Sequence, residues 1–199
     1  MNSELELKTL TEENFADYEE ITKKEGGGGC YCAFWHQKWT SMKGWEAQCK
    51  EHPEKNRAIV AEKLRAGFHV GALVYENGKP AGWVSAGPLT DFYWTWKRLA
   101  AIGASANKTA AILCIAISPD YRGKGFQERV LLKMKGYAKA QGWEYLEGYP
   151  FDAEAIKKHG SSLLWCGYPH IYARAGFERA DTHWLSSPEA PRSIYRVKI

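Results

Sequence analysis

Hydrophobic and polar residues alternate along this chain at strand spacing and at helix spacing in turn. Leu5 and Leu7 stand between charged residues, which predicts a strand over 4–10. Asn77-Gly78 lies between two stretches rich in valine, tryptophan and small residues, 69–76 and 81–87, and therefore predicts a β-hairpin. The remaining apolar runs predict strands at 111–118, 143–149, 177–185 and 194–199.

Helices are expected between these strands. Phe126, Val130, Met134 and Tyr137 recur at the spacing of one helix face, and Gly142 follows them, so a helix is expected over 126–141. Further helices are expected from Thr11 onward, over 53–67, and in part of 161–175, where Pro169 must begin a helix. Two stretches carry no clear period: the four glycines at 26–29, which break the chain, and a long aromatic connection at 88–109.

The stretch 112–127 contains the clearest chemical pattern. It predicts a buried strand, a Pro-Asp turn, a loop with Gly123 and Gly125, and then the start of a helix. Backbone N–H groups at the positive end of a helix bind phosphate, and Arg122 and Lys124 add positive charge at the same place. The sequence therefore predicts a pyrophosphate site. It is neither a P-loop nor a dinucleotide fingerprint, because the glycine spacing of both is missing.

This loop resembles motif A of the GNAT superfamily, the acetyl-CoA-dependent N-acetyltransferases. The family pattern is a strand, a proline, and then Arg/Gln-x-x-Gly-x-Gly/Ala at the opening of a helix. The chain matches it at Pro119 and over 121–125, and departs from it at Gln127, where the family has Gly or Ala. A second stretch, Tyr172-Ala-Arg-Ala-Gly-Phe177, resembles the family's signature at the junction of a late helix and the sixth strand.

The resemblance covers nearly the whole chain and implies its fold. The expected architecture is α/β: a GNAT acyl-CoA N-acyltransferase fold with a mixed, twisted central sheet of six or seven strands and helices on both faces. Residues 1–199 are expected to form one domain, because no linker is long enough to divide them.

The resemblance also implies a cofactor, acetyl-CoA, and the residues that hold it. Free backbone groups of Ile115, Ala116 and Ile117 would bond the pantetheine arm and polarise the thioester carbonyl. The pyrophosphate would lie on the loop. The implied loop residues are Arg122, Gly123, Lys124, Gly125, Phe126 and Gln127.

Acetyl transfer involves two proton transfers: the amine loses a proton, and the departing CoA sulfur gains one. A catalytic group is expected for each. Tyr172 matches the family tyrosine that donates a proton to the departing CoA sulfur, and a phenol suits that role. Glu147, on the strand beside motif A, is the leading candidate for the base that accepts the amine proton. Asp152 is the alternative, and His159 and His170 are weaker candidates.

Composition and charge narrow the class of protein. No run of about 18 apolar residues is present, and the first residues are polar, so a cytoplasmic protein without a membrane partner is expected. Five cysteines, an odd number, argue against a disulfide framework. The net charge of +4 suits an anionic cofactor, and no Lys/Arg-rich run points to nucleic acid.

The segment 30–52 combines cysteines, histidines and aromatic residues. Cys30, Cys32, His36, Cys49 and His52 are zinc-type ligands, but Cys-x-Cys departs from the usual spacing, so no metal is expected. The alternative is that segments 30–66 and 88–109 lie on the acceptor side. Tyr31, Trp35, Trp94 and Trp96 would then bind the acceptor by stacking or cation–π contact. These aromatic residues could instead be core, or an interface in a possible homodimer.

The expected function is acetyl-CoA-dependent transfer of acetyl to a primary amine of a small molecule or peptide, by direct attack in a ternary complex. The alternative is a non-catalytic acyl-CoA-binding or regulatory module, which the departure at Gln127 favours. The acceptor itself is not specified by the sequence, because function is determined by the site and not by the fold.

Overall fold

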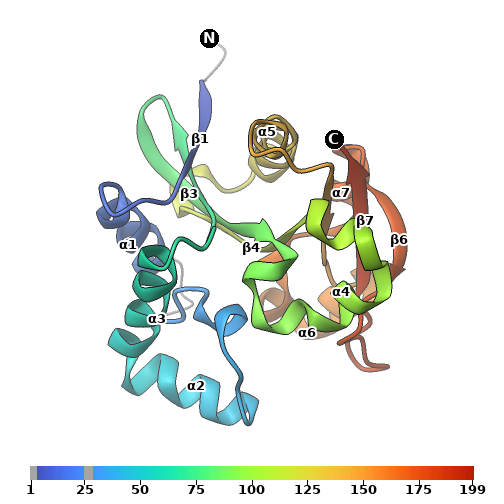
Figure 1. Ribbon diagram of the computed structural model, residues 1–199, viewed down its shortest axis with the longest axis horizontal. Coiled ribbons are helices and arrows are strands. Elements are labelled where there is room, and N and C mark those ends of the chain that lie inside the picture. The colour runs from blue at the N-terminus through green and yellow to red at the C-terminus, as the bar shows by residue number, and fades with distance from the viewer. Residues whose placement is uncertain (1–3, 25–28) are drawn as a thin grey trace.

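The computed structural model describes residues 4–24 and 29–199, so three of the four glycines at 26–29 lie outside the described residues. A single sheet of seven strands, in the order β1-β2-β3-β4-β5-β7-β6, runs through the molecule (Figure 1). The strands are β1 (Leu5–Thr9), β2 (Ala72–Glu76), β3 (Lys79–Pro88), β4 (Thr109–Ile117), β5 (Tyr145–Gly148), β6 (Glu178–Thr182) and β7 (Ser193–Lys198). The expected mixed sheet of six or seven strands is therefore confirmed, with seven strands.

The strand pairings are antiparallel except for the β4–β5 pair, which is parallel. The turn between β2 and β3 is the predicted hairpin turn: Asn77 and Gly78 have φ of 50° and 76°, the positive values that a type I′ turn requires. A parallel pair needs a crossover, and α5 (Phe126–Ala140) provides it between β4 and β5.

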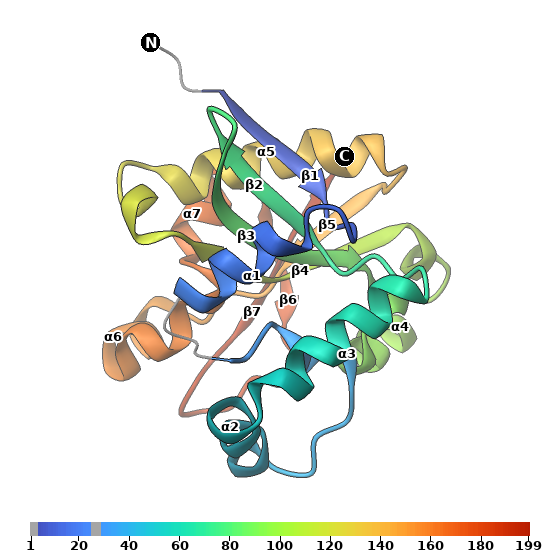
Figure 2. The same cartoon turned by 90° about the vertical axis from the view of Figure 1, so that its left-hand side faces the viewer.

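One face of the sheet is covered by α5 and α7 (Pro169–Arg174), and the buried face of α5 is the predicted one, with Phe126, Val130 and Met134 in the core. The opposite face is covered by α1 (Phe15–Lys24) and α3 (Pro53–Arg65), as Figure 2 shows. On that face Tyr18 packs edge-on against Trp83 of β3, with ring centroids 4.6 Å apart. Helices therefore lie on both faces, as expected.

Three helices were not predicted: α2 (Met42–Glu51), α4 (Trp96–Ile102) and α6 (Ala153–His159). Helix α2 contains no fully buried residue, so no apolar period marks it, although Ser41 caps its N-terminus. Helix α4 spans seven residues and stands among short 3-10 turns, so 88–109 is mostly helical and not an irregular loop. The 3-10 turns are η1 (Ala33–His36), η2 (Leu89–Asp91), η3 (Tyr93–Thr95), η4 (Gly103–Lys108), η5 (Pro119–Tyr121) and η6 (Gly160–Cys166).

The search for membrane spans covered residues 4–24 and 29–199. No helix in those ranges is long and apolar enough to cross a bilayer.

Candidate active site

Strands β4 and β5 diverge after a short paired stretch. They pair only from Thr109 to Ile112 on the β4 side, whereas β4 continues to Ile117. The register against β3 shifts at the same point, and Leu113 is the extra residue of a β-bulge. A bulge bends its strand and re-aims the backbone. The segment 113–117 therefore pairs with β3 on one edge and leaves its other edge without a neighbouring strand.

Two side chains occupy the point of divergence. The Cys166 thiol, at the end of η6, donates a hydrogen bond to the Leu113 carbonyl oxygen at 3.0 Å. The Tyr172 ring, from α7, lies against Gly148, the last residue of β5, where an added Cβ would overlap the ring and its hydroxyl. The predicted catalytic tyrosine therefore lies beside the open edge of β4.

The Tyr172 side chain is 0% exposed, and its hydroxyl has no hydrogen-bond partner among the described residues. Burial raises the pKa of this hydroxyl well above its usual value, and Arg192 acts in the opposite direction. The phenol is therefore held in its protonated form. It can donate a proton only if negative charge develops next to it.

The predicted pyrophosphate loop has an unusual backbone conformation. Gly123, Lys124 and Gly125 all have positive φ, between 53° and 74°, immediately before α5 begins at Phe126. An added Cβ at Gly123 or Gly125 would meet no atom within 4 Å, so these glycines are required by their backbone angles and the space above them is open. The Arg122 guanidinium bonds the Ile117 carbonyl oxygen at 3.1 Å, which ties the loop to the end of β4.

The Gln127 side chain does not cover this loop. It packs against Gly167, where an added Cβ would overlap the Gln127 amide, and the amide nitrogen is buried without a partner among the described residues. Gly167 has φ of 80° and joins η6 to α7. The residue that departs from the motif therefore contacts the segment carrying Cys166 and leaves the loop accessible to a phosphate.

The residues expected to hold the pantetheine arm lie on the unpaired segment of β4. Ile115 is in the core under α5, and Ala116 and Ile117 are half-buried. Phe126 is also core and packs against Tyr121, so it contributes its backbone to the loop and not its side chain.

Glu147, the leading candidate for the base, is 0% exposed and takes part in a buried ion pair. Arg98 of α4 donates to both carboxylate oxygens, at 2.5 and 2.8 Å, and Tyr149 donates at 3.1 Å. Arg196 lies 3.6 Å away. Both carboxylate oxygens of Glu147 are therefore occupied by Arg98 within the described residues. Its catalytic role stays a prediction.

The other candidate bases lie in more ordinary surroundings. Asp152 accepts a hydrogen bond from the Ser193 hydroxyl at 2.9 Å. The His159 ring contacts the Glu189 carbonyl oxygen at 2.9 Å, and His170 lies beside the Tyr168 ring. None of these contacts joins the three residues to Tyr172.

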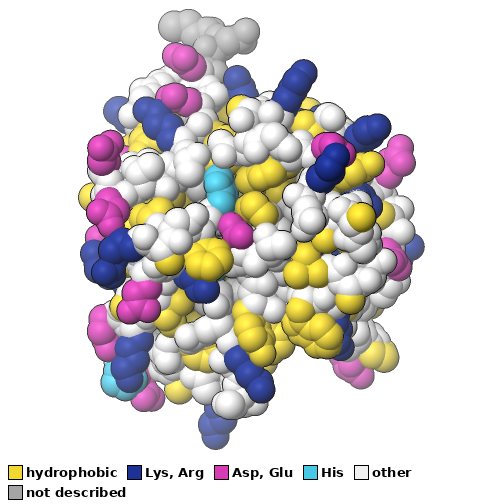
Figure 3. Space-filling view, in the orientation of Figure 1, with side chains coloured by type: hydrophobic (Ala, Val, Ile, Leu, Met, Phe, Trp, Pro, Cys, Tyr) yellow, Lys and Arg dark blue, Asp and Glu magenta, His cyan; other side chains and the backbone are white. Residues whose placement is uncertain are grey.

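The four predicted acceptor-binding aromatic residues divide into two pairs. Tyr31 and Trp35 are buried in the core, so without a rearrangement they cannot contact an acceptor. Trp94 is half-buried and stacks on Phe34, with ring centroids 5.6 Å apart, and Trp96 is 55% exposed. The space-filling view shows hydrophobic side chains gathered over the lower middle of the face drawn in Figure 3. The burial of Tyr31 and Trp35 favours the alternative that these two rings are core. Their binding of an acceptor stays a prediction.

The cysteines of segment 30–52 are held as thiols. Hydrogen bonding to Cys32 and burial raise the pKa of Cys30, and burial raises the pKa of Cys49 to about 11. Within residues 4–24 and 29–199, no three His, Cys, Asp or Glu side chains are arranged to hold a metal ion. All five cysteines are free.

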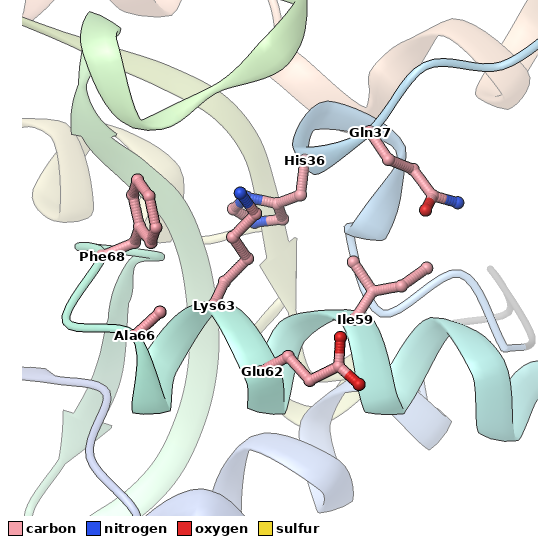
Figure 4. A pocket seen from close by; sticks show the side chains of 7 residues that line it. All are labelled: His36, Gln37, Ile59, Glu62, Lys63, Ala66 and Phe68. Carbon is pink, nitrogen blue, oxygen red and sulfur yellow. The ribbon is translucent and has the colours of Figure 1, made fainter.

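A pocket of about 290 Å³ lies between η1 and α3 (Figure 4). Its lining residues are His36, Gln37, Ile59, Glu62, Lys63, Ala66 and Phe68. The Lys63 ammonium lies over the Phe68 ring, 4.3 Å from its centroid. The lining includes neither Tyr172 nor the glycine loop, so this pocket is separate from the diverging strands.

His36, in the same pocket, gives the protein a pH-dependent stability. Burial, together with the Lys63 charge, lowers the pKa of His36 to about 4. In the unfolded chain His36 therefore becomes protonated below about pH 6.5, whereas in the folded protein it becomes protonated only below about pH 4. The free energy of unfolding should fall by about 3 kcal/mol over this window because of His36 alone.

Denaturant titrations from pH 7 to pH 4 measure this effect. We expect His36→Phe to make the decline smaller by about 3 kcal/mol, while the part that comes from His183 and His69 remains. His170→Phe, at an exposed histidine, is the control and should not reduce the decline in this way. An equal decline in both variants would contradict the assignment.

Three residues of this site have no marker in the sequence. Arg98, Cys166 and Arg192 reach the diverging strands from α4, η6 and the start of β7. Each makes these side-chain hydrogen bonds with residues at least 26 positions away in the chain. The pattern of neighbouring residues carries no information on contacts between residues so far apart in the chain. Only the folded chain reveals them.

Solved structures show the same fold. An aminoglycoside acetyltransferase, AAC(6')-Ib, solved in complex with coenzyme A and kanamycin, aligns with a TM-score of 0.55 and 14% identity, covering 98% of this chain and 95% of that one. The PaiA N-acetyltransferase from Thermoplasma acidophilum, solved with coenzyme A, aligns with a TM-score of 0.52 and 16% identity, covering 98% and 99%. An N-acetyltransferase from Staphylococcus aureus Mu50 aligns with a TM-score of 0.53 and 15% identity, again covering 98% and 99%.

No curated protein matches the sequence. At these low identities the structural likeness shows the fold alone. The sequence profile of the acetyltransferase (GNAT) family, however, matches residues 11–157, which is well over half of the chain. The resemblance expected from the glycine loop is thereby confirmed, and the chain belongs to the acetyltransferase (GNAT) family.

Proposed function

We propose that this protein transfers acetyl from acetyl-CoA to a primary amine of a small molecule or peptide, by direct attack of the amine in a ternary complex. Family membership supports acyl-CoA-dependent N-acetyl transfer in general, with acetyl-CoA as the cosubstrate. One observation carries the proposal furthest: the glycine loop follows the unpaired end of β4 in the chain, and Tyr172 lies against Gly148, where the pairing of β5 with β4 ends.

The residues present fit an acyl-CoA. The loop offers open space, positive charge and a helix N-terminus for a pyrophosphate. Past Ile112, β4 offers backbone groups on an edge without a neighbouring strand, which suit the amides of an extended arm. Acetyl-CoA supplies an activated acyl group as a thioester.

The chain itself contributes position and electrostatics. Backbone dipoles of 113–117 would orient and polarise a carbonyl group at the β4 edge, a role worth about 3–4 kcal/mol per donor where it has been measured. Holding two reactants together can supply on the order of 7–11 kcal/mol more. Tyr172 holds a proton at its hydroxyl, next to the place where the two strands part.

The test begins with calorimetric titration of the protein with acetyl-CoA, CoA and NADPH in parallel. We expect micromolar binding of acetyl-CoA and CoA and none of NADPH. A panel of amines, assayed by the release of CoA thiol, then identifies the acceptor. Absence of acetyl-CoA binding would contradict the proposal.

Tyr172→Phe separates proton donation from binding. We expect turnover to fall about 100-fold, the low end for general acid catalysis, with acetyl-CoA affinity unchanged. Stability should not fall, because the lost hydroxyl has no partner among the described residues. The matched control is Tyr168→Phe, one turn earlier and partly exposed. Full turnover in Tyr172→Phe would show that the sulfur departs without this proton.

A non-catalytic acyl-CoA-binding module is the second candidate. Cys166 and Tyr172 fill the point where β4 and β5 part, which favours a site without room for turnover. Tight CoA binding with no turnover on any amine of the panel would favour this candidate.

Two further expectations belong to the same proposal. We propose that residues 1–199 act as one domain, since strands from both ends of the chain share one sheet. A homodimer is an open possibility that sedimentation of the purified protein would decide.

A further inference from the structure

Arg192 lies just before β7 and is only 3% exposed. Its Nε donates to the Tyr149 carbonyl oxygen at 2.6 Å, and its Nη2 donates to the Cys166 sulfur at 3.3 Å. A guanidinium carries five N–H donors. The described residues therefore engage two of them and leave three available.

Arg192 has no acidic partner in the described part of the chain. No carboxylate oxygen in that part lies within 4.0 Å of it, and its other neighbours are aromatic rings. The ring centroids of Trp165, Phe151, Trp35 and Tyr149 lie 4.4, 4.8, 5.7 and 6.0 Å from the guanidinium carbon. Cation–π contacts offset part of the cost of burying this charge, but they do not neutralise it.

The titratable groups around Arg192 are uncharged at neutral pH. Burial raises the pKa of Cys166 to about 11 and those of Tyr149 and Tyr172 well above their usual value. Burial lowers the pKa of His183 to about 2.

Two further groups lie beyond these neighbours. Glu147, beyond Tyr149, is neutralised by Arg98, and Cys114 lies beyond Tyr172. The positive charge of Arg192 is therefore uncompensated in this part of the core.

This charge lies next to the point where β4 and β5 part. The sulfur that accepts from Arg192 donates to the Leu113 carbonyl, on the bulge of β4. Tyr172 occupies the other side of the same point, against Gly148. The two hydrogen bonds that link Arg192 to the Leu113 carbonyl are 3.3 and 3.0 Å long. In a buried site of low dielectric, a unit charge acts strongly on groups at this range.

We propose that Arg192 stabilises the negative charge that develops on the CoA sulfur as it leaves. This inference rests on the proposed acetyl transfer. In that step the amine nitrogen forms a bond to the acyl carbon, the carbon–sulfur bond breaks, and the sulfur keeps the electron pair. The uncompensated guanidinium would act on that charge from beside Cys166, and its contact with Cys166 shows that it already bonds a sulfur atom. The proton lost by the amine passes to solvent or a base, and Tyr172 returns one to the sulfur.

The first experiment measures the pKa of the CoA thiol in its complex with the protein, from thiolate absorbance against pH. The raised pKa of Cys30, Cys32, Cys49 and Cys166 reduces the protein's own thiolate signal, and a titration of the protein without CoA gives the background to subtract. We expect the bound thiol to titrate at least one pH unit below free CoA. Arg192→Met should restore the value of free CoA, and Arg192→Lys, which keeps the charge, should fall between them.

The second experiment uses the unaltered protein, so it does not depend on a variant that folds. Because the bound thiol would ionise more easily, CoA affinity should rise as pH increases from about 7 to the pKa of free CoA, by about tenfold for each unit of pKa shift. Desulfo-CoA, which lacks the sulfur, should show no such rise and serves as the matched control.

The outcomes separate the two proposals. If CoA binds and its thiol titrates as in water, with equal pH dependence for CoA and desulfo-CoA, the role of Arg192 is overturned while the proposed function stands. If neither ligand binds, the proposed function fails and the inference fails with it.

Discussion

Replacing Glu147 with Gln should destabilise the protein by about 3–5 kcal/mol. The change keeps the shape of the side chain but removes the buried partner of Arg98 and leaves only the exposed Asp181 carboxylate, 3.9 Å away, near the guanidinium. Breaking a buried pair from one side carries this cost. Chemical denaturation at pH 7 measures the loss. Glu154→Gln, at an exposed carboxylate on α6, is the matched control and should change stability by no more than about 0.5 kcal/mol.

The double variant Glu147→Gln/Arg98→Met gives the sharper result. Because it removes both charges, it should be more stable than Glu147→Gln alone. If instead Glu147→Gln and the double variant both keep full stability and lose only acetyl transfer, the carboxylate serves as the base and the ion pair is not structural. The fold then tolerates Arg98 without its buried partner, contrary to the argument from burial.

Replacing Gly125 with Glu should weaken acetyl-CoA binding on the order of 100-fold, or about 2.7 kcal/mol. Gly125 has φ of 69° and caps the N-terminus of α5, and the space around its Cα is open. A carboxylate there would meet the anionic pyrophosphate at the place where the helix end attracts it. Calorimetric titration measures the affinity.

The control for this variant is Gly142→Glu, at the other end of the same helix. Gly142 has φ of 76° and equally open surroundings, so both variants carry a similar backbone strain of about 1–2 kcal/mol. Similar losses of stability with a loss of affinity only in Gly125→Glu would support the loop assignment. Equal affinity in both variants would place the pyrophosphate elsewhere.

The strands and helices that could be predicted are those with a strong local pattern. The hairpin at Asn77-Gly78 depends on two residues that tolerate positive φ, and α5 depends on an apolar face that recurs at helical spacing. Helices α2, α4 and α6 were missed because they are short or contain few buried residues. For such helices tertiary packing decides whether the helix forms, and propensity alone does not.

The candidate site divides in the same way. The glycine loop and Tyr172 could be found because each belongs to a contiguous motif, and a motif of positive-φ residues before a helix has local causes. The aromatic residues of segments 30–66 and 88–109 could not be sorted, since the same residue type serves as core at Trp35 and as surface at Trp96. Burial is a property of the assembled chain.

The sequence by itself determined the family, the order of most strands and helices, and the loop that suits a pyrophosphate, because these depend on residues close together in the chain. The tertiary structure alone decided which charges face one another. It paired Glu147 with Arg98, turned Gln127 toward Gly167, and brought Arg192 beside Cys166 without an acidic partner among the described residues. Electrostatic interactions of this kind act through space between distant segments, so their energies are set only once the chain has folded.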